Sequence, residues 1–284
     1  MRLRADLTLL FVSILWGSAF VFQRIVGEQG DVYYFNGMRF LLGTFMLLPF
    51  IRKQRKISQI SREQWIWMGL AGAILFTAAA LQQAGIQYTT AGNAGFITTL
   101  SVVIVPFVLL VGWRERPRWL EVVAVILAGV GAYLLSTGGS FKIQKGDALE
   151  LAGALFWSLH FVVLGKFAVR FASIQFAVGQ FLVAGLLNFM VGIFFERLML
   201  NPVLVGAVVY TAVFSVGIGY TLQVWGQRYT PPTDAALILS LEAVFALLSG
   251  WLFLSETLTV IQITGCALIL GGVLLTQFRG GNSE

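Results

Sequence analysis

Apolar residues dominate the chain in ten long runs that are separated by short polar stretches. Each run holds about 20 residues, the length that an α-helix needs to cross the hydrocarbon core of a bilayer. Backbone polar groups must be paired inside that core, and continuous apolar runs of this length pair them as helices. The pattern therefore predicts ten membrane-spanning helices, at residues 6–26, 32–51, 65–86, 93–113, 118–137, 148–167, 174–195, 203–225, 234–254 and 259–278.

Composition supports a membrane protein rather than a water-soluble one. Hydrophobic residues make up 58% of the chain and charged residues only 11%, whereas average proteins carry about 25% charged residues. The first apolar run is too long for the core of a signal peptide and lacks a convincing cleavage site, so we expect it to remain as a span. The single cysteine, Cys266, lies in an apolar run, which excludes a disulfide framework or a cysteine metal site within the chain.

The basic residues indicate an orientation. Fourteen of the 19 Lys and Arg residues fall on the side of the predicted N-terminus, and only Lys142, Lys145 and Arg197 fall on the other side. Cytoplasmic loops carry an excess of Lys and Arg, so we expect both termini in the cytoplasm. The formal net charge of +6 then has a topological cause and does not indicate a nucleic-acid partner.

The two halves of the chain repeat one another at a constant offset of 141 residues. The stretch "LQQAGIQYTT" at 81–90 matches "LQVWGQRYTP" at 222–231, and the same offset relates Trp16 to Trp157, Phe20 to Phe161, Phe40 to Phe181, Glu115 to Glu256 and Gly131 to Gly272. Each half contains five predicted spans, an odd number, so the second half should enter the membrane inverted. Inverted repeats are typical of secondary transporters. We therefore predict two five-helix repeats, residues 1–141 and 142–284, around a central cavity in one integrated membrane domain, with a duplicated scaffold that does not transport as the alternative.

Four parts of the chain carry distinctive motifs. They are "LWGSAF" at 15–20, "RFLLG" at 39–43, and two segments that run from "YTTAGNAGFITTL" to "GWRERP" and from "YTPPTDAALILSLEAVFALLSGWLFLSETLT" to "CALILGGVLL". These motifs resemble the drug/metabolite transporter (DMT) superfamily in its EamA-type, ten-helix branch. The resemblance implies two five-helix halves around a central cavity, alternating access and, in many members, export of amino acids or related metabolites.

Within that superfamily the overall pattern is most similar to amino-acid exporters of the YddG kind in the bacterial inner (plasma) membrane. The resemblance thus implies a multi-pass exporter in that membrane. The turn "GWRERPR" departs from the more typical apolar-Gly-Glu turn of the family. This departure weakens any role that the resemblance would give to Glu115.

Ionisable residues inside predicted spans indicate function, because burying them is costly. Four residues of this kind stand out, Arg24, Arg39, His160 and Glu242. At about 1.5 Å per residue, His160 and Glu242 come out at nearly the same depth in a core about 30 Å thick. Three of these residues have a structural alternative. His160 could be a hydrogen-bonded packing histidine, Glu242 a protonated or hydrogen-bonded carboxyl group, and Arg39 one member of an ion pair. We expect Arg24, near a helix end, to snorkel to the interface.

Aromatic residues share helix faces with these groups. Trp157 and His160 are three residues apart on one face, which Phe161 partly extends, and Trp16, Phe20 and Gln23 form the matching face of the first span. We predict that Trp16, Trp157, His160 and Glu242 line one mid-membrane chamber. Its rings would attract ammonium groups through cation–π interaction, and its carboxylate would pair with an ammonium group.

Further polar residues are candidates for hydrogen bonds to a substrate. We include Gln83, Tyr210, Ser101 and Arg39 in the predicted substrate site, and Gln82, Gln223, Tyr88, Thr98 and Thr99 are weaker candidates. Side-chain amides also join helices in membranes, and hydroxyl groups also bond back to their own helix. Asn93 and Asp234 stand at the starts of two spans, where we expect them to act as N-caps.

An intramembrane enzyme is the main alternative from another class. The chain has no His-Glu-x-x-His pattern, no phosphate-binding loop of the Gly-x-x-x-x-Gly-Lys-Ser/Thr type, and a single histidine. We therefore predict a secondary transporter without a cofactor, whose partners are a small-molecule substrate and the lipid bilayer. The predicted substrates are aromatic and other apolar amino acids or related metabolites, and hydrophobic drugs are the alternative. Glu242 and His160 could titrate, so the sequence leaves open whether protons are a coupling ion or transport is facilitated diffusion.

Overall fold

The computed structural model describes residues 1–53, 60–89, 91–137, 145–254 and 259–277, which form helices joined by short loops. These residues contain no β-strand. In chain order the helices are α1 (Arg2–Gly27), α2 (Tyr33–Lys53), α3 (Arg62–Ile86), α4 (Ala91–Thr99), α5 (Ser101–Trp113), α6 (Trp119–Thr137), α7 (Lys145–Lys166), η1 (Ala168–Arg170), α8 (Ser173–Phe195), α9 (Pro202–Tyr210), η2 (Thr211–Tyr220), α10 (Thr221–Gly226), α11 (Pro232–Leu239), α12 (Glu242–Leu254) and α13 (Val260–Gln277).

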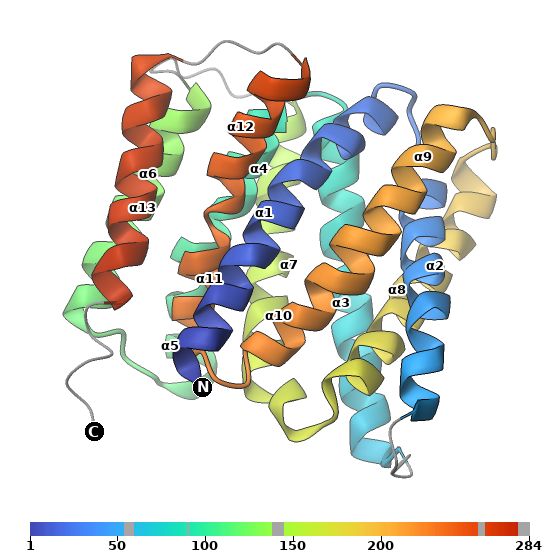
Figure 1. The fold of residues 1–284 in the computed structure, drawn as a ribbon, viewed down its shortest axis with the longest axis horizontal. Coiled ribbons are helices and arrows are strands. Elements are labelled where there is room, and N and C mark those ends of the chain that lie inside the picture. The colour runs from blue at the N-terminus through green and yellow to red at the C-terminus, as the bar shows by residue number, and fades with distance from the viewer. Residues whose placement is uncertain (54–59, 90, 138–144, 255–258, 278–284) are drawn as a thin grey trace.

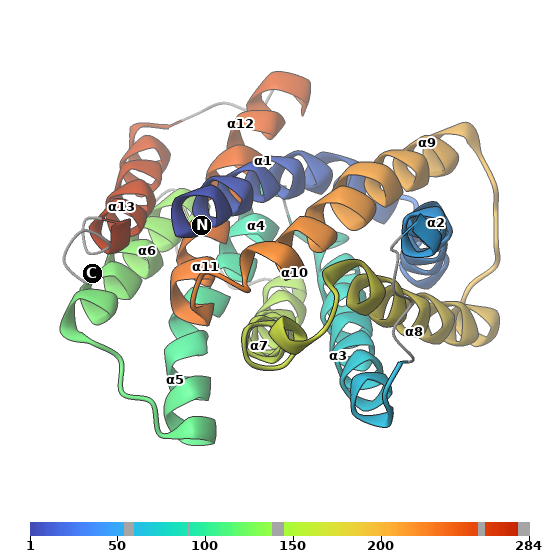
Figure 2. The ribbon, with the colours of Figure 1, turned by 60° about the horizontal axis from the view of Figure 1, so that its bottom comes forward.

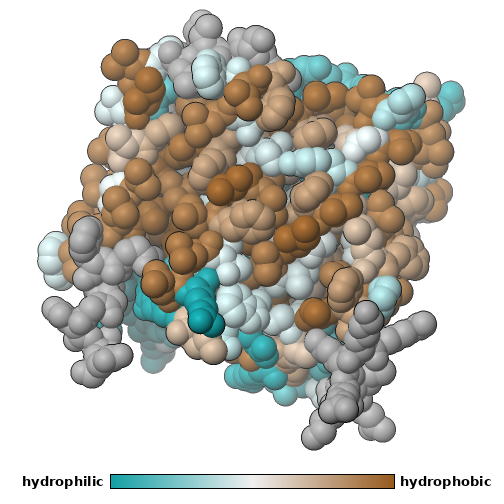
Figure 3. Space-filling model, viewed as in Figure 1, coloured by the Kyte–Doolittle hydropathy of each residue, from teal (hydrophilic) through white to brown (hydrophobic). Residues whose placement is uncertain are grey.

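These helices make up ten apolar segments. Eight segments of the described chain are long and apolar enough to cross a membrane, and α6 and α13 contain two shorter apolar stretches. The ten segments follow the ten predicted runs in order and nearly in position. In Figure 3, hydrophobic side chains cover most of the visible face and hydrophilic ones gather near its margins. The prediction of an all-α membrane protein with ten spans is confirmed.

Neighbouring helices come from both halves of the chain. The most extensive pairings are α6 with α13, α2 with α8, α3 with α7, α3 with α8 and α1 with α12. Figures 1 and 2 both show α6 and α13 side by side at one flank of the molecule, while α2 and α8 lie at the other. The two halves therefore share one interface through the centre of the molecule.

The fourth and ninth spans are broken, although their apolar patterns predicted continuous helices. One break separates α4 from α5 at Leu100, and the other separates α11 from α12 at 240–241. In both breaks the chain makes a tighter turn, in which Leu100 N–H donates to the Ile97 carbonyl (3.0 Å) and Leu241 N–H donates to the Ile238 carbonyl (3.2 Å). The two turns are 141 residues apart, the offset of the sequence repeat.

At each break a hydroxyl group bonds back to its own helix. The Thr99 hydroxyl donates to the Gly95 carbonyl (2.9 Å), and the Ser240 hydroxyl donates to the Leu237 carbonyl (2.6 Å). Such back-bonding competes with backbone hydrogen bonds and bends helices. The Thr99 hydroxyl also lies 3.3 Å from the Ser240 carbonyl oxygen, so the two breaks touch. Discontinuous helices that meet inside a bundle commonly form the solute site of a transporter.

The eighth span contains a π-helix, η2, between α9 and α10. π-Helical turns are rare and occur frequently at functional sites. Here the Trp16 indole N–H donates to the carbonyl of Ser215 (3.2 Å). A Cβ at Gly219 would lie 2.6 Å from that indole nitrogen, so the approach of Trp16 requires glycine at this position.

Glu196, which follows α8, anchors the start of α2. Its carboxylate accepts hydrogen bonds from the backbone N–H groups of Val32, Tyr33 and Tyr34 at 2.9–3.0 Å. N–H groups at a helix start have no partner within the helix, and a negative charge suits that end. We expect Glu196→Ala to lower the free energy of unfolding in detergent by about 1–3 kcal/mol. Arg197→Ala, at the exposed neighbouring position, is the matched control, and equal losses in the two variants would contradict this role.

Candidate functional site

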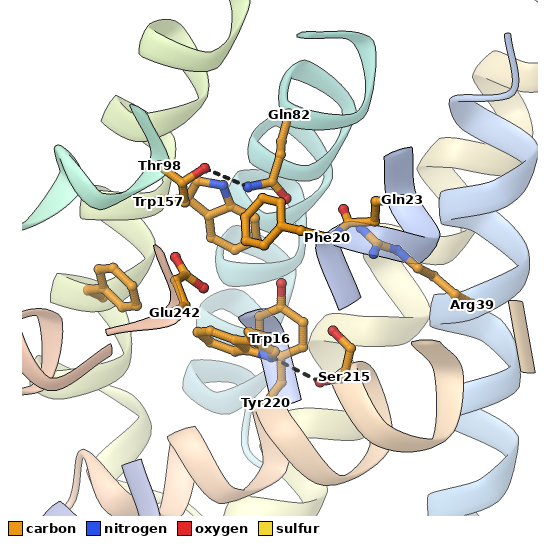
Figure 4. Close-up of a pocket in the computed structure, with 11 residues that line it drawn as sticks. Trp16, Phe20, Gln23, Arg39, Gln82, Thr98, Trp157, Ser215, Tyr220 and Glu242 are labelled. Carbon is orange, nitrogen blue, oxygen red and sulfur yellow. Dashed lines mark hydrogen bonds between the residues drawn. The ribbon is translucent and has the colours of Figure 1, made fainter. Parts of the chain in front are cut away.

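A narrow chamber lies between the two halves of the molecule, beside the helix breaks and the π-helix. Its walls consist of Trp16, Phe20 and Gln23 from α1, Arg39 from α2, Gln82 from α3, Thr98 from α4, Trp157 and Phe161 from α7, Ser215 and Tyr220 from η2, and Glu242 from α12 (Figure 4). The centres of water-sized molecules have ≈ 20 Å³ available to them, which is room for about one or two waters. The chamber in this conformation is too small for an organic solute, so it must widen before one can bind.

Aromatic rings surround the chamber with Tyr220 at their centre. The Tyr220 ring lies 4.7 Å from the Trp16 ring and stacks on the Trp157 ring at 6.1 Å. The Trp157 indole N–H is buried and has no hydrogen-bond partner in the structure. Buried indole N–H groups usually have a partner, so this donor is available to a solute.

One basic and one acidic side chain face the chamber. Arg39 and Glu242 are only 2% and 6% exposed, and neither takes part in an ion pair of the described residues. The Arg39 guanidinium lies over the rings of Phe35 (5.0 Å) and Phe40 (5.2 Å), and its Nε has no hydrogen-bond partner. In Figure 4 Arg39 and Glu242 lie on opposite sides of the central aromatic rings. Burying such groups without a partner is costly.

Neutral polar groups complete the walls. Gln82 donates a hydrogen bond through Nε2 to the Thr98 hydroxyl at 2.8 Å. The side-chain oxygen of Gln23 is buried without a hydrogen-bond partner. In the part of the chain that the structure describes, no group of three or more His, Cys, Asp or Glu residues is placed to hold a metal ion.

The structure brings together four of the eight residues that the sequence analysis places in the substrate site. Trp16, Trp157, Glu242 and Arg39 all line the chamber. His160, expected beside them, is fully buried behind the wall, and its Nε2 lies 2.9 Å from the Gln180 side-chain oxygen. This contact matches the alternative of a hydrogen-bonded packing histidine.

The other three predicted site residues lie outside the chamber walls. Gln83 donates to the Gln23 backbone carbonyl at 2.9 Å and so joins α3 to α1. The Tyr210 hydroxyl lies 2.7 Å from the Ser18 hydroxyl. Ser101 is buried at the start of α5. The structure thus gives Gln83 and Tyr210 contacts between helices.

The structure gives Arg24 its partners and corrects one expectation about a charged residue at a helix end. The Arg24 guanidinium donates to the Ile86 and Gln87 carbonyls (2.7 and 3.3 Å) and pairs with the exposed Glu28. Carbonyls at the end of α3 have no helical partner there, and Arg24 supplies one. Asp234 is not an N-cap, because it lies in the first turn of α11 and pairs with Arg2. The side chain of Asn93 lies outside the described residues.

Two wall residues were missing from the sequence analysis. Ser215 and Tyr220 belong to the π-helix, whose wider turn shifts side chains away from the faces of a regular helix. A signal was nevertheless present, since Tyr220 carries a polar tip inside an apolar run and directly follows Gly219.

Known proteins provide an independent comparison. An "Uncharacterized transporter" of Archaeoglobus fulgidus is 33% identical over 279 residues, which cover 98% of this chain and 87% of that protein. "Uncharacterized transporter YvbV" of Bacillus subtilis is 23% identical, with 98% and 93% covered. A solved crystal structure shares the fold with a TM-score of 0.83 at 18% identity, over 98% of this chain and 100% of that one.

One family model matches the chain twice, once in each half. The model of the EamA-like transporter family matches residues 3–137 and again residues 144–278. The second match begins 141 residues after the first (144 − 3 = 141), which is the offset of the sequence repeat. Together with the ten apolar segments and the transporters named among its relatives, these matches show that the chain is a multi-pass membrane transporter of the EamA-like transporter family within the DMT superfamily.

Proposed function

We propose that this transporter exports aromatic and other apolar amino acids or closely related metabolites. The observation that supports it is the chamber with aromatic walls, in which one guanidinium group and one carboxyl group take part in no ion pair of the described residues. The ammonium group of an amino acid would bind Glu242 and the ring faces of Trp16 and Trp157. Its carboxylate would accept hydrogen bonds from Arg39, and its apolar side chain would contact the aromatic rings. The resemblance of the motifs to bacterial inner-membrane amino-acid exporters supports the same substrate class.

Alternating access is the proposed mechanism. A contact between the halves lies at each end of the molecule: the Thr230 hydroxyl donates to Asp6 (2.7 Å) at the end with the N-terminus, and the Thr89 hydroxyl donates to Asp147 (3.2 Å) at the other end. These two hydrogen bonds are related by the 141-residue offset. Breaking one while the other persists would open the narrow chamber to one side only, as rocking of two inverted repeats requires.

The proposed orientation places both termini in the cytoplasm of the cell. The excess of basic residues on that side supports it. In this orientation the Thr89–Asp147 contact closes the outer side, and the Thr230–Asp6 contact closes the cytoplasmic side. Outward movement of solute then requires the second contact to open first.

Counterflow into proteoliposomes tests the proposed substrate class. Vesicles loaded with unlabelled tryptophan should take up labelled tryptophan, phenylalanine and leucine faster than empty vesicles without protein. Tryptamine, which lacks the carboxylate, and indole-3-propionate, which lacks the ammonium group, should compete poorly because each leaves one buried charge unpaired. Uptake of hydrophobic amines or dyes with no uptake of amino acids would overturn the proposal in favour of a drug carrier.

The Trp157 ring makes a further prediction. Trp157→Ala removes a stacked ring and an indole donor from the chamber, so the apparent KM for tryptophan should rise by roughly 2- to 13-fold, from the ~0.5–1.5 kcal/mol of an aromatic pair. The KM for leucine should rise less. Trp119→Ala changes a tryptophan that is 72% exposed and outside the chamber, and the same rise in this control would contradict a role for Trp157 in binding.

A further inference from the structure

A second buried carboxyl group lies just outside the chamber. Glu150 of α7 is 0% exposed, and its carboxyl group faces the Thr98 hydroxyl of α4. No ion pair of the described residues includes it. Its Cγ lies 2.7 Å from the place that a Cβ at Gly85 would occupy. The carboxyl group is therefore enclosed where α7 packs against α3.

The chain contains its own comparison for this packing. Leu9 precedes Glu150 by 141 positions, and Leu9 packs against Gly226 as Glu150 packs against Gly85, with its Cδ2 at 2.9 Å from the Cβ position of Gly226. One half of the molecule thus fills this place with a leucine and the other with a carboxyl group. Since leucine satisfies the packing, and a buried carboxyl adds a desolvation cost, packing does not explain the glutamate.

Glu150 lies between one end of the molecule and the chamber. Asp147, one turn earlier on α7, lies in the first turn of that helix and accepts the Thr89 hydrogen bond. On the other side, the Thr98 hydroxyl of α4 faces the Glu150 carboxyl group, and both Thr98 and Glu242 of α12 line the chamber. We refer to Asp147, Glu150, Thr98 and Glu242 as a row, because Asp147 lies toward the start of α7 and the last two residues lie at the solute chamber.

The described groups that act on the Glu150 carboxyl group are Asp147, Thr98 and Glu242, and none of them is basic. Lys145, at the start of α7, lies over the ring of Tyr88 at 5.0 Å. On α3 the residues nearest to the row are Gly85 and Gln82, which carry no charge. Without a cation, a buried carboxyl group is far more stable with its proton than without it. Water at the end of α7 would allow that proton to exchange.

We propose that Glu150 is a proton-binding site that couples solute export to proton entry. The proposal rests on the proposed transport function. At the end with α7, the Glu150 carboxylate takes a proton from water and transfers it through the Thr98 hydroxyl to the Glu242 carboxylate as the solute ammonium leaves. At the other end, the next ammonium group displaces that proton from Glu242 into water. One proton crosses the membrane for each solute that moves in the opposite direction.

Proteoliposomes separate this coupling from transport itself. With the membrane potential clamped and the interior about one pH unit more acidic than the bath, the wild-type protein should accumulate tryptophan up to ~10-fold, because one pH unit corresponds to a tenfold ratio for one proton exchanged. Glu150→Gln should keep counterflow, which needs no gradient, and lose this accumulation. A pH-sensitive dye inside the vesicles should report proton exit with solute entry for the wild type only.

Two variants serve as controls. Glu150→Leu copies Leu9 of the other half, so it should fold, retain counterflow and lose accumulation. Glu63→Gln changes an exposed glutamate at the start of α3 and should retain both activities. Thermal unfolding in detergent checks that each variant is folded.

The outcomes distinguish the two proposals. If the wild-type protein shows no counterflow of amino acids, the proposed function fails. If counterflow occurs but the pH gradient causes no accumulation, or if Glu150→Gln still accumulates tryptophan, the proton site is overturned and the transport function stands. If neither Glu150→Gln nor Glu150→Leu folds, the carboxyl group is structural and the inference is wrong.

Discussion

Replacing Glu242 by glutamine is expected to lower amino-acid transport by at least about tenfold, which corresponds to ~1.4 kcal/mol. Glutamine keeps the size and hydrogen-bonding capacity of the side chain but removes its charge. Truncating one partner of a buried charge pair costs about 2–5 kcal/mol. Glu242 has no ion-pair partner among the described residues, so the bound ammonium group of the solute would be its partner. Both counterflow and gradient-driven accumulation should fall, unlike the selective loss expected for Glu150→Gln.

Counterflow of labelled tryptophan and leucine measures this effect, with thermal unfolding as the check on folding. Arg39→Gln is the matched variant, and glutamine is the residue that stands at the repeat-related position, Gln180. It should also lower amino-acid transport, but it should improve competition by tryptamine, which lacks the carboxylate. Unchanged transport in a folded Glu242→Gln protein would reject the role of this carboxyl group.

The ten spans could be predicted from the sequence because the bilayer fixes the length and polarity of a spanning helix. The breaks at Thr99 and Ser240 could not be predicted, because a threonine or serine in a bent helix looks the same in the sequence as one in a straight helix. Tyr220 was missed because its direction depends on a π-helix. His160 has the depth of a chamber residue, but its direction depends on Gln180, which approaches from another helix.

Glu150 shows a similar limit of sequence reasoning. It lies near the predicted start of its span, where a carboxyl group usually reaches water, so the sequence gives no reason to count it as buried. Its burial depends on the absence of a side chain at Gly85, on a helix far away in the chain. Depth along a helix is readable from sequence, whereas the neighbours of one face are set by packing.

The chamber combines a repeated scaffold with chemistry that occurs once. Four of its five aromatic residues come in pairs related by 141 positions, Trp16 with Trp157 and Phe20 with Phe161, whereas the counterpart of Tyr220 is Ala79. Its charges do not, since position 101, the counterpart of Glu242, is a serine. This difference fits the proposed solutes. Two similar halves can exchange conformations, while an amino acid has one ammonium group and one carboxylate and needs one partner for each.

Gly131→Val is expected to destabilise the protein strongly at the contact between α6 and α13. A Cβ at Gly131 would lie 2.5 Å from the Gly265 carbonyl oxygen and 2.8 Å from the Ile269 backbone nitrogen, and a Cβ at Gly272 would lie 2.7 Å from the Ala124 carbonyl oxygen. Backbone atoms cannot rotate away as a flexible side chain can. Overpacking of this kind costs about 1–3 kcal/mol or more, so the free energy of unfolding in detergent should fall by at least that amount.

Gly271→Val is the matched control, because a Cβ at Gly271 has nothing within 4 Å. Both substitutions place the same β-branched residue in a helix, so their difference isolates the close contact from helix propensity. Equal losses of stability would show that α6 and α13 separate easily and that Gly131 and Gly272 are not required at their contact. No wall residue of the chamber belongs to α6 or α13. The fraction of Gly131→Val protein that still folds should therefore bind solute with an unchanged KM, which would place the defect in helix association rather than in the site.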